Sequence, residues 1–208
     1  MPPAAPFHLG RGGTGPTQQS NLTCGSASLT VSRMLVSTQF EKWIVDGIDG
    51  AGGPPDSRTE AERFAEHERA VMSRTNGIRG AGGGFNVPWP HAWGTPPWGA
   101  EKELEHGAAR AGAAYELRLV RLFSQDALRE IHGNLGRLVR EGLPALLYIG
   151  NAWVPRHVTL VLPGDREREL VVYDPATGAV TELDPARFAS RTLGIAGWNV
   201  PWFTVQPR

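Results

Sequence analysis

The chain has 208 residues, of which 40% are hydrophobic, and this is enough for one domain with a proper core. Lysine plus arginine equal aspartate plus glutamate at 21 each, so the formal net charge is zero, which argues against nucleic acid or an anionic membrane as the main partner. No apolar stretch is long enough to span a membrane and no signal peptide is evident. The expected location is therefore the cytoplasm as synthesised, with export by a route without a signal peptide left open.

Two parts of the chain differ from the rest in composition. Residues 1–16 are rich in proline, glycine and threonine, which predicts a flexible N-terminal tail. Residues 17–208 are expected to form a single domain. Within it, about 40–115 is interpreted as an insertion, where glycine-rich stretches flank predicted helices at 60–73 and 101–112.

The only cysteine of the chain, Cys24, begins a predicted helix over residues 24–38. Ala27, Val31 and Met34 recur there at three- and four-residue intervals, as on one face of a helix. In a first helical turn, unpaired backbone N–H groups and the positive end of the helix dipole favour a thiolate. Gly25 permits the close approach of a substrate backbone. The alternative is an ordinary amphipathic helix, since free cysteines are often buried hydrophobes.

The insertion carries three tryptophans in ten residues, namely Trp89, Trp93 and Trp98. Aromatic surface of this size is expected to pack on the domain or to line a cleft. Both interpretations stay open, and the same holds for Trp153, four residues before His157. As candidates for substrate binding, these four tryptophans would restrict what enters the cleft.

The last third of the chain predicts a helix followed by a meander of strands. Ser124 caps a helix that runs to about residue 141, with leucine and isoleucine on one face. The later strand-like runs are separated by turns short enough for antiparallel hairpins. A short helix and one more strand follow. The strands are expected at 145–149, 157–162, 170–173, 180–183 and 202–206, and the short helix at 186–189. This order predicts an α+β fold and not a doubly wound parallel sheet.

Cys24, His157 and Asp174 together have the residue types that nucleophilic catalysis needs. A thiol at a helix start, with a histidine and an aspartate on two later strand-like runs, provides a nucleophile, its base and the group that orients the base. Two alternatives stay open. His157 could be a buried strand histidine, and Asp174 could be only the first residue of a type I turn, with Pro175 next.

These motifs, in this order, resemble the papain-like cysteine peptidases. Gln18 lies six residues before a Cys-Gly pair, and a His-Val strand and a Tyr-Asp-Pro-x-x-Gly turn follow far downstream. Within that superfamily the chain is most similar to the bacterial branch of bacteriocin-leader peptidases. The continuation Cys-Gly-Ser-Ala-Ser departs from the usual Cys-Gly-Pro-Ala. The resemblance covers roughly residues 17–38 and 124–190, and it implies an N-terminal helix with the cysteine packed against an antiparallel sheet with the histidine and aspartate.

The resemblance also implies a role for each matching residue. Cys24 would attack a carbonyl carbon, His157 would hold the thiolate as an ion pair and protonate the leaving group, and Asp174 would orient the ring. Gln18 would pair with the Cys24 backbone N–H in an oxyanion hole, a contribution of about 3 kcal/mol. Gln19 is the rival donor if the loop is one residue shorter, and Gln18 could also be a solvated loop residue.

Three classes of function follow. The favoured class is a cysteine peptidase-like thiol hydrolase acting on a peptide or protein. The second is a transglutaminase-like or deamidating enzyme with the same triad, as a delivered bacterial toxin with an immunity or inhibitor protein as partner. The third is a non-catalytic papain-like binding module, which the intact triad argues against. We expect no cofactor. We expect no metal either, because the other histidines lack zinc-like spacing, namely His67, His91, His106 and His132.

Overall fold

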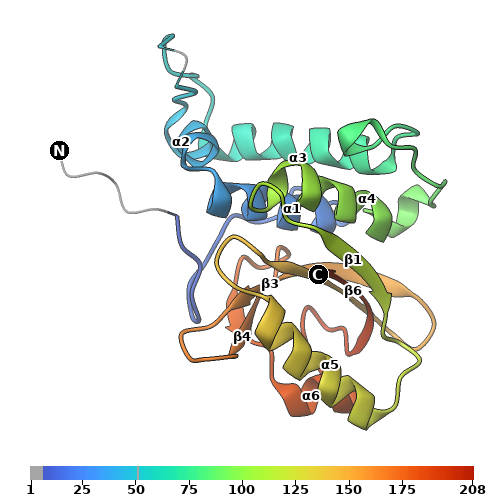
Figure 1. Cartoon of the computed structure of the whole chain (residues 1–208). Helices are drawn as coiled ribbons and strands as arrows, with labels where there is room; N and C mark the ends of the chain where they lie inside the picture. Colours follow the sequence, from blue (N-terminus) through green and yellow to red (C-terminus); the bar gives the residue numbers. More distant parts are fainter. Residues whose placement is uncertain (1–6, 51) are drawn as a thin grey trace.

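An antiparallel sheet of six strands, covered by helices on both faces, forms the centre of the molecule (Figure 1). The computed structural model describes residues 7–50 and 52–208. The strand order is β1-β6-β2-β3-β4-β5, and each neighbouring pair is antiparallel. The α+β prediction is therefore confirmed. The strands are β1 (Tyr115–Leu119), β2 (Ala145–Gly150), β3 (Pro155–Pro163), β4 (Leu170–Tyr173), β5 (Val180–Glu182) and β6 (Val200–Pro207).

The sheet is apolar on both faces because its central strands alternate between two cores. Along β2, Leu146 and Tyr148 belong to the core on the side of the first helix, whereas Leu147 and Ile149 belong to the core on the opposite side. The second core is closed by α5 (Gln125–Leu138) and α6 (Pro185–Ser190). Helix α5 begins at its predicted cap, since Ser124 accepts a hydrogen bond from Ala127 N at 3.3 Å, and α6 is capped by Asp184, which accepts one from Arg187 N at 2.7 Å.

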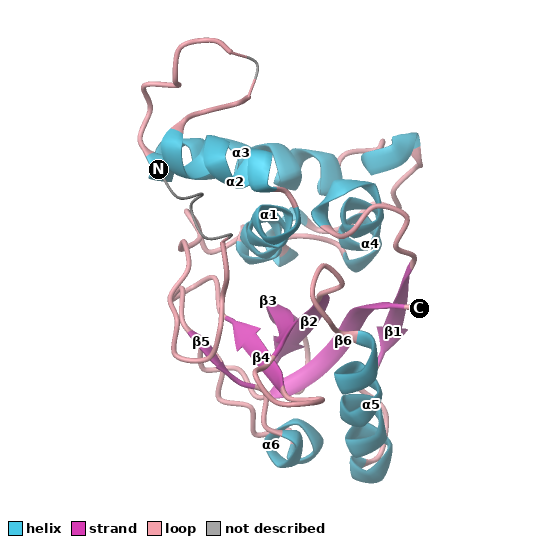
Figure 2. Cartoon of the chain, turned by 60° about the vertical axis from the view of Figure 1, so that its left-hand side comes forward, coloured by secondary structure: helices cyan, strands magenta, loops and turns pink. Residues whose placement is uncertain are grey.

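Helix α1 (Cys24–Val36) lies between the sheet and a second layer of helices, so it is buried on nearly all sides (Figure 2). The predicted apolar face accounts for only part of the buried surface of this helix. The remaining faces carry small polar residues whose hydroxyls find partners, as Thr30 does by donating to Ser26 O at 2.8 Å. The predicted helix over 24–38 ends earlier, because Ser37 is extended and its side chain caps α2 (Thr38–Asp46).

The insertion forms the layer that covers α1. It contains α2, α3 (Glu60–Asn76), α4 (Pro97–Glu103) and the short turns η1 (Ala81–Gly83), η2 (His91–Trp93) and η3 (Leu104–Ala108). Helices α3, α4 and η3 all pack on α1. Removing this layer would expose one side of the helix that begins at Cys24, so the insertion completes the core of the domain.

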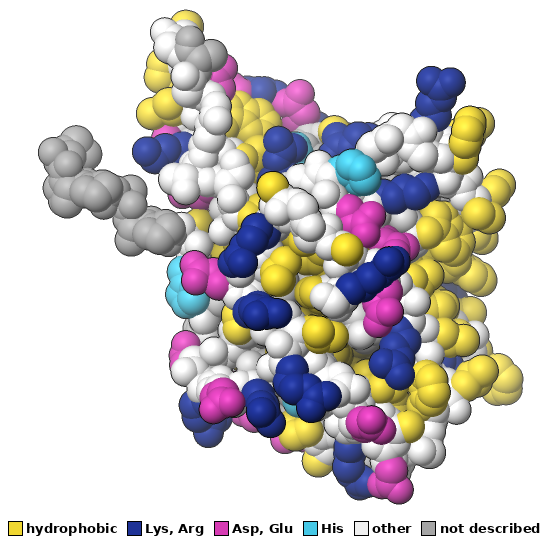
Figure 3. Space-filling view, in the orientation of Figure 1, with side chains coloured by type: hydrophobic (Ala, Val, Ile, Leu, Met, Phe, Trp, Pro, Cys, Tyr) yellow, Lys and Arg dark blue, Asp and Glu magenta, His cyan; other side chains and the backbone are white. Residues whose placement is uncertain are grey.

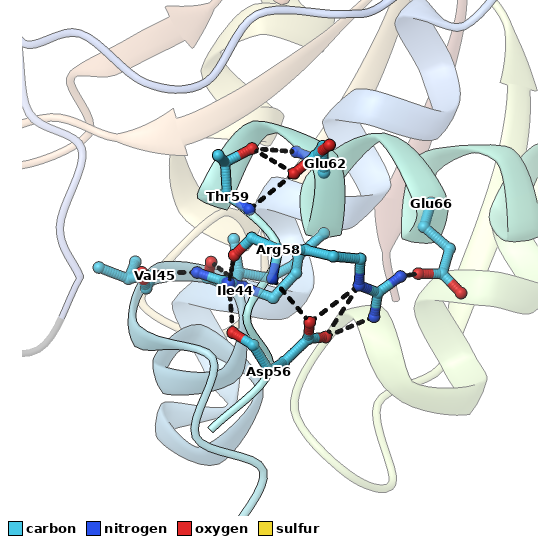
Figure 4. A network of polar contacts seen from close by, with 8 residues as sticks. Ile44, Val45, Asp56, Arg58, Thr59, Glu62 and Glu66 are labelled. Carbon is cyan, nitrogen blue, oxygen red and sulfur yellow. Dashed lines mark hydrogen bonds and ion pairs between the residues drawn. The ribbon is translucent and has the colours of Figure 1, made fainter. Parts of the chain in front are cut away.

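The start of α3 is fixed to the end of α2 by a network of polar contacts (Figure 4). Buried Arg63 donates to Ile44 O and to Val45 O, each at 2.9 Å, so it satisfies two carbonyls at the end of α2. Thr59 and Glu62 form the reciprocal hydrogen bonds of a capping box. The first turn of α3 is therefore held in place by the contacts of Arg63 with α2 and by its own capping box.

The N-terminal segment differs from the flexible tail expected over residues 1–16. Leu9 is buried in the core beneath α1, and Gly12 and Gly15 donate backbone hydrogen bonds to Val180 O and Gly178 O at 2.9 and 2.8 Å. The segment therefore runs along the β5 edge of the sheet. Residues 1–6 lie outside the described part of the chain.

The surface mixes charges of both signs. On the face shown in Figure 3, basic and acidic side chains lie side by side, and hydrophobic side chains gather along the right-hand edge. Among the residues that the structure describes, no helix combines the length and apolar character that crossing a membrane requires.

Candidate active site

A cleft of about 410 Å³ brings together three of the residues that the sequence singled out, Gln18, Cys24 and His157. They come from the loop before α1, from the first turn of α1 and from β3. In the register of the sheet, His157 lies opposite Ile149 of β2. Gln18 and His157, the outermost of the three, are 139 positions apart in the sequence, and they meet because α1 packs directly on β3.

His157 and Asp174 form a buried, hydrogen-bonded pair. The ring Nε2–H of His157 donates to Asp174 Oδ1 at 2.6 Å, and both residues are 6% exposed. A charge-assisted bond this short fixes the tautomer and the orientation of the ring. Since Nε2 is occupied by Asp174, Nδ1 is the nitrogen left for the Cys24 thiol, whose interaction with the ring raises the pKa of His157.

Asp174 also closes the turn between β4 and β5, in addition to its hydrogen bond with His157. Its Oδ1 accepts from Ala176 N at 3.0 Å and its Oδ2 accepts from Thr177 Oγ1 at 3.1 Å. Gly178 ends the turn with a φ of 74°, and a Cβ at this position would lie 2.4 Å from Gly15 O. The turn therefore holds the carboxylate rigidly toward His157.

The contact between His157 and Asp174 raises the pKa of the histidine and lowers the pKa of the aspartate. Burial would lower the pKa of His157, but the hydrogen bonds to Asp174 and Cys24 and the charges of the same two groups raise it to about 9. Burial would raise the pKa of Asp174, but the hydrogen bonds from His157 and Ala176 hold it below its usual value. Near neutral pH the ring is protonated and the carboxylate is ionised.

The backbone at the start of α1 offers free donors to the cleft. Thr23, the residue before the helix, makes no side-chain cap hydrogen bond, and the Cys24 backbone N–H has no partner among the described residues. Cys24 itself is 4% exposed. A helix start with unsatisfied N–H groups stabilises negative charge placed next to it.

Of the two glutamines in the preceding loop, only Gln18 reaches the cleft. Its Nε2 donates to Ser20 O at 2.8 Å, which uses one of its two amide protons, and its buried Oε1 has no partner. Gln19 is exposed, and its side chain donates to Thr17 O at 3.2 Å. The geometry therefore favours Gln18 over its rival as a donor to a bound group.

Glu68 on α3 holds this glutamine loop, a function that the sequence did not indicate. The carboxylate is fully buried and accepts the backbone N–H of Gln19 at 3.1 and 3.2 Å. Burial raises the pKa of Glu68, against the effect of hydrogen bonds from Thr23 and Gln19. The insertion thereby supports the residue next to Gln18.

We expect Glu68→Ala to lower the free energy of unfolding by about 2 kcal/mol, because it leaves the Gln19 N–H without a partner and opens a cavity. Glu68→Gln keeps an acceptor oxygen and should cost less. Glu66→Ala, at an exposed position of the same helix, is the matched control and should change stability by about 0.5 kcal/mol or less. Urea unfolding measures all three, and equal losses for the two alanine variants would contradict this role.

The three tryptophans of the insertion contact one another, and only one of them lines the cleft. Trp89 packs edge-on against Trp93 and Trp98, with ring centroids 5.2 and 5.0 Å apart. Trp93 is 41% exposed and lines the cleft beside Cys24. Trp89 therefore packs between the other two rings, and Trp93 is the member of the cluster that reaches the cleft.

Trp153 does not line the cleft, which corrects the expectation for this residue. It is 84% exposed in the turn between β2 and β3. Asn151 Oδ1 accepts the backbone N–H groups of Trp153 and Val154 at 2.8 and 3.0 Å, and this turn presents the indole outward. Trp198, from the segment before β6, lines the cleft instead. Its segment has no helical or strand periodicity that could have revealed it.

The missing side chain of Gly25 makes room for a segment of the insertion, and not for a substrate backbone as expected. A Cβ at Gly25 would lie 2.6 Å from the Cβ of Thr95. Thr95 is buried, its hydroxyl lies 3.1 Å from Ser26 Oγ, and its carbonyl accepts from Tyr148 Oη at 3.1 Å. The glycine therefore allows the segment after Trp93 to pack directly on the start of α1.

In the described part of the chain, no three histidine, cysteine, aspartate or glutamate side chains gather as a metal ion would need. His67 hydrogen-bonds Thr30 and Arg33, and burial followed by the charges of Arg33 and Arg74 lowers its pKa to about 3. His132 hydrogen-bonds Leu183 O at 2.7 Å. These histidines have structural partners of their own.

Comparison with known proteins finds similarity among the solved structures. No family model matches the sequence, and no curated protein matches it. The chain is similar to the peptidase domain of Streptococcus ComA, a bi-functional ABC transporter involved in a quorum-sensing pathway, at 15% identity and a TM-score of 0.41, covering 94% of this chain and 98% of that chain. It is also similar to the Pseudomonas avirulence protein AvrPphB, at 10% identity and a TM-score of 0.45, covering 97% and 96%.

Proposed function

We propose that the chain is a cysteine peptidase-like thiol hydrolase that cleaves a peptide or amide bond through an acyl-enzyme on Cys24. The observation that supports this most is the buried hydrogen bond between His157 and Asp174, with His157 and the Cys24 thiol in the wall of one cleft. A thiol held against a protonated imidazole is the arrangement that nucleophilic acyl transfer requires.

Each residue then has one role in the reaction. The Cys24 thiolate attacks the carbonyl carbon, and the charge that develops on the oxygen meets the free Cys24 N–H and the second amide proton of Gln18. The His157 imidazolium gives its proton to the leaving amine and then takes one from the water that hydrolyses the acyl-enzyme. Asp174 holds the ring in the required orientation throughout.

Acyl transfer to an amine and deamidation would use the same residues, so the product decides between them. Incubation with a mixed peptide library, followed by mass spectrometry, should show new chain ends with the wild type and none with a Cys24→Ala control. Cross-linked or deamidated glutamine side chains without new chain ends would contradict the hydrolase. Such products would match the alternative of a delivered toxin with an immunity partner, which acts on a protein target.

We expect Asp174→Asn to lower kcat/KM only about 10-fold, because the amide oxygen still accepts from His157 and Ala176 while the amide N–H₂ donates to the Thr177 hydroxyl. Asp174→Ala leaves the ring without an orienting partner and should cost roughly 10³-fold or more. Steady-state kinetics on one cleaved peptide measures both. Equal activities of the asparagine and alanine variants would show that Asp174 serves the turn only.

A further inference from the structure

The cleft contains one charged side chain that the proposed chemistry does not use, that of Arg156. It directly precedes His157 on β3, is exposed, and lines the same cleft as Cys24. Among the residues that the structure describes, no hydrogen-bond or ion-pair partner contacts its guanidinium. The five donors of this group are therefore not used by the described residues of the chain itself.

The rest of the cleft wall makes a negative group the fitting partner for Arg156. No aspartate or glutamate is among the residues that line the cleft, and Trp93 and Trp198 contribute apolar surface. His157 beside it is the other ionisable cation, and it is engaged with Asp174 and Cys24. A cleft with one unpaired guanidinium and apolar walls strengthens its attraction for a carboxylate and penalises a second cation.

We propose that Arg156 is a specificity-determining residue, which selects substrates that carry an aspartate or glutamate side chain beside the bond that is cut. The inference rests on the proposed function and names its substrate class. A carboxylate accepts two parallel hydrogen bonds from a guanidinium, and a substrate that fills the cleft removes water from this ion pair. A lysine in the same place would meet Arg156 as a like charge.

The first test compares two alkylating reagents that differ only in charge, iodoacetate and iodoacetamide, at low salt and neutral pH. Arg156 should favour the anionic reagent at Cys24, so the ratio of the two rate constants should fall roughly 10-fold in Arg156→Gln and further in Arg156→Glu. Arg137→Gln is the matched control, since Arg137 is exposed on α5, on the opposite face of the sheet. An unchanged ratio in Arg156→Gln overturns the inference, whether or not the chain cuts peptides.

The second test sequences the products from a mixed peptide library. The wild type should enrich aspartate or glutamate at one fixed position near the cut, Arg156→Gln should lose this preference by roughly 10-fold in kcat/KM, and Arg156→Glu should turn it toward lysine and arginine. Cleavage by the wild type without acidic enrichment overturns the inference and leaves the proposed function standing. No cleavage by the wild type contradicts the proposed function and this inference with it.

Discussion

Cys24→Ala is expected to abolish turnover, with a loss of at least about 10⁴-fold in kcat, while the protein stays folded. The loss is this large because the remaining groups cannot form a covalent intermediate without the sulfur. The fold should survive because alanine is a good helix former and the side chain is small, so the free energy of unfolding should change by about 1 kcal/mol or less.

The kinetics of a cleaved peptide and a urea titration together check this expectation. Ser26→Ala is the matched control, because Ser26 lies two residues further along the same buried helix and contacts Thr95 and not the cleft. It should reduce stability and leave kcat within about 10-fold of the wild type. If Cys24→Ala cut any substrate at the wild-type rate, the covalent mechanism would be excluded.

His157→Ala is expected to be nearly as severe, with kcat/KM lower by roughly 10⁴-fold, since both the partner of the thiolate and the proton donor are lost. It should also change how stability depends on pH. The folded-state pKa of His157, about 9, lies above its ordinary value of 6.5, so the protonated ring stabilises the folded state.

This contribution should be complete below about pH 6.5 and lost as the pH rises through about 9. The difference in unfolding free energy between wild type and His157→Ala should therefore shrink across this range, by about 3 kcal/mol as an order of magnitude. Chemical unfolding on both sides of the range measures it. A difference that stays constant with pH would mean that the ring is neutral in the folded protein.

The members of the proposed triad could be singled out from the sequence because each has a strong local signal. Cys24 begins an apolar helical run, His157 lies in an apolar strand, and Asp174 precedes Pro175 in a short turn between two strands. These local patterns depend little on the rest of the fold. The order of predicted elements, helices first and a meander of strands afterwards, indicated the α+β architecture that the structure confirms.

Features that depend on distant contacts could not be predicted in the same way. Glu68 contacts a residue 49 positions away, and Thr95 meets Ser26 across 69 positions. Strand β1, by contrast, carries a local signal that was missed, because Tyr-Glu-Leu-Arg-Leu alternates between apolar and polar residues as a strand with one covered face does. The segment along the β5 edge is rich in glycine and resembles a tail, because backbone pairing needs no particular side chains.

The central claim is that His157 activates Cys24, and the pH dependence of Cys24 alkylation tests it most directly. Intact mass after timed exposure to iodoacetamide gives the rate, and with a single cysteine each added group reports on Cys24 alone. An ordinary thiol reacts appreciably only as the pH approaches about 8.5. Because the pKa of His157 is raised to about 9, we expect the wild type to react faster than His157→Ala while the ring is protonated, and to lose this advantage as the pH rises through about 9. Matching pH profiles in the two proteins would contradict the claim.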